Sequence, residues 1–206
     1  MVYFGYKRIY QEGPFFMSKR QIVAIVGLPG SGKTEVIEYL IKKLSWPKIY
    51  LGDATFEELK KRGLVVSEKN ERMAREGLRE KYGMACYALW AIKKIKELKS
   101  TQNILIESLY SWDEYLEFKK AFNEEFSVVA IYASPKMRYA RLGKRPVRPL
   151  TPEEARSRDF AQIGNIAQAG PIAIADWTVM NDGSRQNLFL QLNKIIKQIK
   201  KISRPA

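Results

Sequence analysis

Histidine is absent from the 206-residue sequence and cysteine occurs once, and each shortage removes a class of chemistry. Without histidine, no imidazole can serve as a general base, complete a nucleophilic triad or bind a metal. The single cysteine, Cys86, excludes an intramolecular disulfide and is expected to be a small buried residue. The chemistry that remains belongs to lysine, arginine, carboxylates, hydroxyls, backbone amides and a hard cation such as Mg²⁺.

Long apolar segments are also missing from the sequence. No apolar run approaches the roughly 18 residues of a membrane-spanning helix, and residues 1–16 lack the apolar core and cleavage site of a secretory signal peptide. We therefore expect a soluble, cytoplasmic protein. Because Met17 stands just before a strand-like run, residues 1–16 are expected to be an N-terminal extension that need not be native, and residues 17–206 to form the domain.

Acidic residues are scarce relative to basic ones. The chain has 22 Asp+Glu against 36 Lys+Arg, a formal net charge of +14. Such a field attracts phosphate-bearing molecules, from nucleotides to nucleic acids, without identifying which. The apolar fraction of 46% suffices for the core of one domain.

Short strand-like runs alternate with longer segments of helical period along the chain. This alternation predicts a three-layer α/β fold, with a parallel sheet of about five strands and helices on both faces. The expected strands are residues 21–26, 48–51, 103–107, 127–133 and 177–180. The expected helices include residues 55–62, an unbroken stretch over 68–99, residues 112–122, and segments that begin at Pro135, at Pro152 and after Ser184.

One segment carries a specific motif. Residues Gly27 to Thr34 read G-L-P-G-S-G-K-T, which satisfies G-x-x-x-x-G-K-[ST] between a predicted strand and a predicted helix. In this P-loop, backbone N–H groups and the helix N-terminus face phosphate oxygens. We expect Lys33 to reach the β- and γ-phosphates of a nucleotide and the Thr34 hydroxyl to bind Mg²⁺. The predicted nucleotide contacts of the loop are Gly27, Pro29, Gly30, Ser31, Gly32, Lys33 and Thr34.

Two carboxylates end predicted strands, where open α/β sheets bind their ligands. Asp53 is interpreted either as the group that orients or deprotonates an acceptor hydroxyl, or as the N-cap of the helix that follows. Glu107 is interpreted either as the carboxylate that holds Mg²⁺ through water, or as an exposed strand end. Both alternatives stay open for both residues.

In their order and spacing, these segments resemble the nucleoside monophosphate kinase group of P-loop proteins. The chain looks nearest to the archaeal adenylate-kinase-related proteins, which are also similar to dephospho-coenzyme A kinase. The resemblance covers residues 21–199, and only the P-loop is specific on its own. Its other anchors are Leu51-Gly52-Asp53, Lys61-Arg62-Gly63, Leu78 to Gly83, Ala133 to Arg138, Arg158-Asp159, and Ala175-Asp176 with Asn181 to Ser184.

The resemblance implies roles for a lid at residues 143–158 and its surroundings. In such kinases one arginine stacks on adenine and another contacts phosphate, and Arg141 and Arg145 stand in that arrangement here. Arg158 resembles the arginine that closes on the transferred phosphoryl group. Asn181 begins a turn that resembles the loop meeting adenine through its backbone.

On the acceptor side the chain departs from that pattern. Residues Glu107 to Ser111 lack the arginine that such kinases use for the acceptor's phosphate, and Phe56 stands where another arginine is common. Arg79 is interpreted as a surface residue of a helix or as a phosphate contact, and Arg138 as a surface or lid residue. Acceptor binding has therefore changed, weakened or moved to another molecule.

These observations predict ATP-dependent phosphoryl transfer to a small, nucleotide-like acceptor, with ATP and Mg²⁺ as cofactors. Lys33, Arg145 and Arg158 would stabilise the phosphoryl group in transit, and Asp53 would orient the acceptor. One alternative is a dephospho-coenzyme A kinase, which differs only in its acceptor. The other is a nucleotide-binding protein with a degenerate acceptor site that binds nucleic acid or a protein partner.

Overall fold

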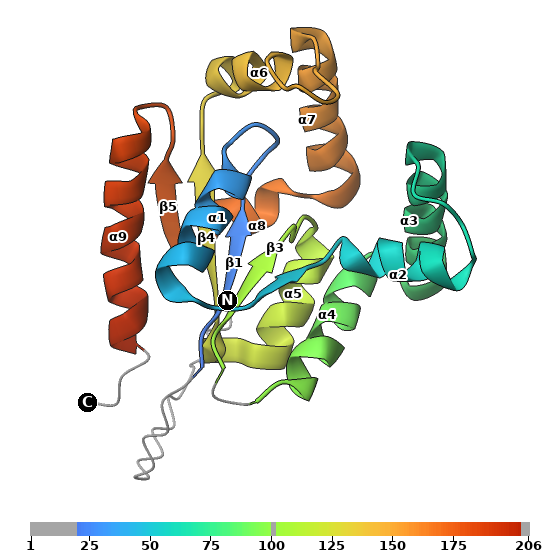
Figure 1. The fold of residues 1–206 in the computed structure, drawn as a ribbon, viewed down its shortest axis with the longest axis horizontal. Helices are drawn as coiled ribbons and strands as arrows, with labels where there is room; N and C mark the ends of the chain where they lie inside the picture. The colour runs from blue at the N-terminus through green and yellow to red at the C-terminus, as the bar shows by residue number, and fades with distance from the viewer. Residues whose placement is uncertain (1–19, 100–101, 203–206) are drawn as a thin grey trace, which may run out of the picture.

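A computed structural model describes residues 20–99 and 102–202 of the chain (Figure 1). The expected extension at residues 1–16 and the expected start at Met17 lie outside these residues. The centre of the fold is a five-stranded, all-parallel sheet in the order β2-β3-β1-β4-β5. Its strands are β1 (Ile22–Val26), β2 (Lys48–Tyr50), β3 (Ile104–Glu107), β4 (Phe126–Tyr132) and β5 (Trp177–Met180). The predicted α/β fold with a five-stranded parallel sheet is confirmed.

Helices cover both faces of this sheet (Figure 1). They are α1 (Lys33–Leu44), α2 (Asp53–Lys61), α3 (Glu68–Tyr82), α4 (Cys86–Glu97), α5 (Trp112–Phe122), α6 (Pro135–Gly143), α7 (Pro152–Ile166), α8 (Ala169–Ala173) and α9 (Arg185–Ile202), with a 3₁₀ turn at Asn123–Glu125. No helix in the described part of the chain is long and apolar enough to cross a bilayer.

The central strands β1, β3 and β4 are buried on both faces because their alternate side chains enter two different cores. In β1, Ile22 and Ala24 pack with buried residues of α4 and α5. Val23 and Ile25 pack instead with buried residues of α1 and α9. This two-sided burial explains why the strand sequences are continuous apolar runs rather than alternating ones.

Local signals set where several helices begin. At α7, the Thr151 side chain accepts a hydrogen bond from the Glu154 backbone N–H, while Glu154 accepts one from the Thr151 N–H. Ser111 and Glu114 form the same reciprocal pair at α5. Pairs of this kind satisfy backbone donors that the first helical turn would otherwise leave free.

The prediction of one helix over residues 68–99 is wrong. The structure has two helices there, because Gly83 follows α3 with a φ of 81°, a conformation that glycine adopts at little cost. The short helix α8 was not predicted, since five residues give too little periodicity to detect.

Two pairs of helices extend beyond the carboxyl ends of the strands (Figure 1). Helices α6 and α7 pack on one another and form the lid region beside the P-loop. Helices α2 and α3 pack on one another at the other side of the sheet and form a helical hairpin. The P-loop between β1 and α1 therefore has the lid to one side and the hairpin to the other.

Candidate active site

The P-loop takes its conformation from glycines that no other residue can replace. Gly27, Gly30 and Gly32 all have positive φ angles. At Gly30, with φ of 78°, an added Cβ would lie 2.6 Å from the Arg138 carbonyl oxygen, so the space as well as the backbone requires glycine. The loop consequently passes close to the first turn of the lid helix α6.

Lys33 is folded back over this loop. Its Nζ donates hydrogen bonds to the carbonyl oxygens of Gly27 at 2.6 Å and Leu28 at 3.0 Å. The pKa of Lys33 is lowered to about 8, first by burial and then by the positive charges of Arg145, Arg158 and Arg138, while Glu107 opposes the shift. An ammonium group surrounded by other cations is electrostatically suited to bind a multiply charged anion such as a triphosphate.

Arg145 and Arg158 bring this positive charge from the lid. Arg145 follows α6 and Arg158 lies on α7, and their side chains form no ion pair with any described residue. The pKa of Arg145 is lowered, first by partial burial and then by Arg158. The structure therefore brings Lys33, Arg145 and Arg158 into one positive field, as the sequence analysis expects.

Arg138 has a different role from the other lid arginines. Its side chain is 3% exposed, and its two Nη atoms donate to the two Asp159 carboxylate oxygens at 2.8 and 2.7 Å. It also donates to the carbonyl oxygens of Pro29 and Ala133. The interpretation of Arg138 as a solvated residue is wrong, because it joins α6, α7 and the P-loop in a buried network.

Arg141 and Asn181 form a second set of hydrogen bonds to the P-loop. Arg141 donates to the Asn181 carbonyl oxygen at 2.7 Å and to the Gly30 carbonyl oxygen at 3.4 Å. The buried Asn181 side chain donates to the Ser31 carbonyl oxygen at 2.8 Å. The structure thus brings these two residues together beside the loop, with Arg141 engaged by protein carbonyls, so the expected stacking of Arg141 on adenine stays a prediction.

Thr34 and Glu107 line one cavity of about 360 Å³ together with Lys33. A hydroxyl and a carboxylate are oxygen ligands of the kind that Mg²⁺ prefers. Among the described residues, no group of three or more acidic or cysteine side chains could enclose a metal alone. The pair therefore suits a cation whose remaining ligands come from nucleotide phosphates and water.

Lys48 was not singled out by the sequence analysis. It lies on β2 at the edge of the sheet, and its Nζ forms an ion pair with Glu107 Oε2 at 2.5 Å. Its charge also lowers the pKa of Asp53. A lone lysine at the start of a short strand carries no sequence signal, since only the pairing of β2 with β3 brings it beside Glu107.

Asp53 is the first residue of α2, and the N-cap position belongs to Gly52. The Asp53 side chain makes no capping hydrogen bond, so its interpretation as the N-cap is wrong. Partial burial raises the pKa of Asp53, Lys48 opposes the shift, and Glu57 and Glu107 add to it. A carboxylate with a raised pKa is a better proton acceptor than an ordinary aspartate.

The loop after β3 and a residue of the α7–α8 connection add polar groups that sequence reasoning missed. Ser108 has a φ of 69°, unusual for a residue other than glycine, and its hydroxyl lies 3.0 Å from the Tyr110 hydroxyl. Both residues line the cavity that holds Lys33. Far along the chain, buried Gln168 donates from Nε2 to the Gly27 carbonyl oxygen at 3.1 Å. The left-handed backbone of Ser108 and the long-range contact of Gln168 have no signature in sequence.

Known proteins resemble this chain in sequence and in fold. The family model for the AAA domain matches residues 23–161, which include the P-loop and most of the lid. A UPF0200 protein of Thermococcus kodakarensis is 34% identical over 182 residues, covering 86% of this chain and 97% of that protein. A UPF0200 protein of Pyrococcus abyssi is 36% identical over 182 residues, covering 86% and 96%.

Solved structures with a similar fold include two small-molecule kinases. Shikimate kinase from Bacteroides thetaiotaomicron superposes with a TM-score of 0.56 at 16% identity, covering 87% of this chain and 98% of that one. A gluconokinase from Sinorhizobium meliloti superposes with a TM-score of 0.51 at 13% identity, covering 89% and 98%. The two share the fold but differ in acceptor, so the likeness concerns the fold alone. On the matched domain and on its identity to these relatives, the chain belongs to the AAA-domain family and to the UPF0200 proteins.

Proposed function

We propose that the protein is an ATP-dependent kinase that transfers the γ-phosphoryl group to a small, nucleotide-like acceptor. The observation that carries this proposal is Lys33, which lines a cavity with Thr34 and Glu107 and whose pKa is lowered first by burial and then by the positive charges of the lid arginines Arg145 and Arg158. Buried positive charges that repel one another are stabilised when an anion joins them. A phosphoryl group in transit supplies such an anion.

In this proposal the chain's own residues have distinct roles. Lys33 and the P-loop amides bind the β- and γ-phosphates, and the braces from Arg138 and Asn181 keep the loop in its binding conformation. Arg145 and Arg158 stabilise the charge on the transferred group. The acceptor oxygen forms a bond to the γ-phosphorus while the bond to the leaving ADP oxygen breaks. Asp53 orients the acceptor, and where the attacking oxygen is a hydroxyl it takes the hydroxyl proton.

Magnesium belongs to the proposal as a cofactor. When bound, it would neutralise part of the negative charge of the phosphates. Thr34 would contribute its hydroxyl as a ligand, and Glu107 would hold the ion through water. Glu107 already forms an ion pair with Lys48 at 2.5 Å. Its carboxylate would therefore have to contact both Lys48 and the water that holds the ion.

The resemblance of the sequence to the adenylate-kinase-related proteins favours a nucleotide as acceptor, and dephospho-coenzyme A is the alternative substrate. Lid closure should exclude water, so ATP hydrolysis without an acceptor is expected to be slow. Brisk hydrolysis would favour an ATPase instead. Because the chain has a formal net charge of +14, nucleic-acid binding is the alternative function that the experiment below also tests.

A coupled kinase assay tests the proposal directly. AMP, CMP, UMP, GMP and dephospho-coenzyme A are offered in turn with ATP and Mg²⁺, and one of them should yield a phosphorylated product. Lys33→Met should slow transfer by about 10²- to 10³-fold, because it removes the charge that binds the phosphoryl group. Lys42→Met changes an exposed lysine of the same helix and should leave the rate unchanged.

Two results would contradict the kinase proposal. One is transfer by Lys33→Met at the rate of the unmodified protein. The other is no product from the whole panel together with RNA or DNA binding that weakens steeply with salt, which would favour the nucleic-acid-binding alternative.

A further inference from the structure

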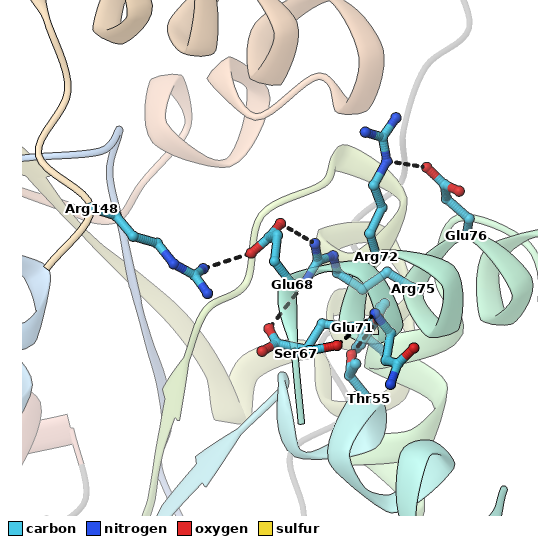
Figure 2. Close-up of polar contacts among 10 residues, drawn as sticks. Thr55, Ser67, Glu68, Glu71, Arg72, Arg75, Glu76 and Arg148 are labelled. Carbon is cyan, nitrogen blue, oxygen red and sulfur yellow. Dashed lines mark hydrogen bonds and ion pairs between the residues drawn. The ribbon is translucent and has the colours of Figure 1, made fainter. Parts of the chain in front are cut away.

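The arginines of the α2–α3 hairpin are mostly neutralised by carboxylates close to them in sequence. Arg62 pairs with Glu58 at 2.7 Å and Arg72 with Glu76 at 2.9 Å. Arg75 lies 3.4 Å from both Glu68 and Glu71. Figure 2 shows the pairs made by Arg72 and Arg75 on the surface of α3. Such exposed pairs are an ordinary feature of a solvated helix.

Arg79, one turn beyond Arg75, does not fit this pattern. It forms no ion pair and donates no hydrogen bond to any residue that the structure describes. Its Nε is buried and without a partner, although the side chain as a whole is only partly buried. A guanidinium has five N–H donors, and withdrawing one from water without an acceptor costs about 1–3 kcal/mol. The interpretation of Arg79 as a plain surface residue is therefore wrong.

The surroundings of Arg79 lie on the acceptor side of the site. Its guanidinium carbon is 5.7 Å from the centre of the Tyr87 ring, which supports it as a cation–π platform. The Tyr87 hydroxyl lies 2.8 Å from the Thr55 hydroxyl, and Thr55 is two residues beyond Asp53. Arg79 is thus linked through Tyr87 to the start of α2, where the proposed proton acceptor lies.

Glu114 is affected by the charge of Arg79 but forms no ion pair with it. The charge of Arg79 acts on the buried Glu114 carboxylate, but Glu114 Oε2 is already engaged by the backbone N–H groups of Tyr110 at 2.7 Å and Ser111 at 2.9 Å. Tyr110 in turn lines the cavity that contains Lys33. Arg79 therefore lies between the start of α2 and the loop after β3, the two segments that lack the expected acceptor arginines.

We propose that Arg79 binds an anionic group of the acceptor, a phosphate or a carboxylate, in place of those missing arginines. This inference rests on the proposed kinase function and specifies its acceptor as an anion. A guanidinium fork matches either group with two parallel hydrogen bonds. The neighbouring cations are less suited, because Lys48 is engaged by Glu107 and Arg75 by its two glutamates.

A direct test observes the Arg79 side chain by NMR in the full-length protein. The P-loop is first saturated with Mg²⁺ and a non-hydrolysable ATP analogue, so that added anions meet only the remaining sites. The Nε–H signal of Arg79 is assigned by its loss in Arg79→Lys. On titration with inorganic phosphate or acetate, this signal should shift and saturate, while the Arg72 signal should not saturate.

The two anions distinguish the two acceptor chemistries. Saturation by phosphate alone indicates a phosphate-bearing acceptor such as a nucleotide, and saturation by acetate alone indicates a carboxylate-bearing one. If the Arg79 signal fails to saturate with either anion, or follows the Arg72 signal throughout, the inference is overturned. This readout does not depend on a known acceptor or on turnover.

A kinetic test uses whichever acceptor gives product. Arg79→Met should raise the KM for the acceptor at least about tenfold and leave ATP-analogue affinity unchanged, since it removes one charged contact. Arg79→Lys should restore part of the loss, which a merely structural role would not predict. Arg72→Met is the matched control on the same helix. An unchanged acceptor KM in a folded Arg79→Met variant would contradict the inference while leaving the kinase proposal intact.

Discussion

The proposed nucleotide side and the proposed acceptor side of this molecule are built in different ways. Around the P-loop, buried hydrogen bonds from Arg138, Asn181 and Gln168 hold the loop carbonyls, and its lysine faces two unpaired lid arginines. Across the sheet, Lys48 is engaged by Glu107, and an unpaired arginine lies beside a buried glutamate. On the first side, buried hydrogen bonds hold the P-loop. On the second side, the charged side chains form local ion pairs or no ion pair.

The difference corresponds to the two kinds of ligand that the two sides are proposed to bind. A triphosphate presents the same oxygens in every P-loop protein, so one loop with fixed amides serves all of them. Acceptors differ from one kinase to the next, and residues that meet them need only suit one molecule. The similar folds of a shikimate kinase and a gluconokinase illustrate this separation between a shared fold and distinct acceptors.

The largest expected effect concerns the buried brace on the nucleotide side. Arg138→Met should lower the free energy of unfolding by about 3–5 kcal/mol, because it leaves the Asp159 carboxylate buried without its partner. Urea unfolding followed by circular dichroism measures the change. The double variant Arg138→Met/Asp159→Leu should recover part of the loss. A loss below about 1 kcal/mol for the single variant would show that the P-loop does not depend on this pair.

On the proposed acceptor side, Glu114 should make the stability of the protein depend on pH. The carboxylate is 2% exposed, and burial raises its pKa to about 7 against the opposing effect of amide hydrogen bonds and Arg79. Because this pKa is above the unfolded value of 4.5, ionised Glu114 destabilises the fold above pH 7, and the penalty disappears as pH falls toward 4.5. Its size is on the order of 3 kcal/mol.

Glu114→Gln removes this titration while keeping an oxygen for the Tyr110 and Ser111 amides. The wild-type protein should therefore gain stability relative to Glu114→Gln between pH 8 and pH 5, by up to about 3 kcal/mol in urea unfolding. Asp113→Asn, which changes an exposed carboxylate of the same helix, is the matched control. If the difference in unfolding free energy between the two proteins stayed constant from pH 8 to pH 5, Glu114 would have the same pKa in the folded and unfolded states.

The sequence predicts the local features of this molecule better than its long-range contacts. The P-loop motif and the Thr151–Glu154 capping pair depend on residues within a few positions of each other, so local patterns suffice. The Arg138–Asp159 pair, the Gln168 contact to Gly27 and the Lys48–Glu107 pair join residues 21, 141 and 59 positions apart. Such contacts exist only once the sheet order and the lid geometry are formed.

A smaller effect tests the electrostatics of the P-loop. The pKa of Lys33 is about 8 in the protein alone, and phosphate charge must raise it on binding. Above pH 8 binding therefore requires uptake of a proton, and affinity for a non-hydrolysable ATP analogue should fall by up to about tenfold per pH unit. Calorimetry in buffers of different ionisation enthalpy detects that proton. Lys33→Met should show neither the slope nor the uptake, and a wild-type affinity that stays constant from pH 8 to 9.5 would contradict the assignment.

The smallest expected effect concerns the contact that spans the two halves. Arg148, after the lid helix α6, forms an ion pair with Glu68 at the start of α3 at 2.6 Å (Figure 2). Both side chains are more than half exposed, so water and salt screen the pair and its contribution to stability is about 0–1 kcal/mol. A double-mutant cycle with Arg148→Ala and Glu68→Ala at low and high salt measures this coupling. A coupling above about 2 kcal/mol that persists at high salt would mean that lid and hairpin are joined as one rigid unit, and that the braced side extends to the acceptor side.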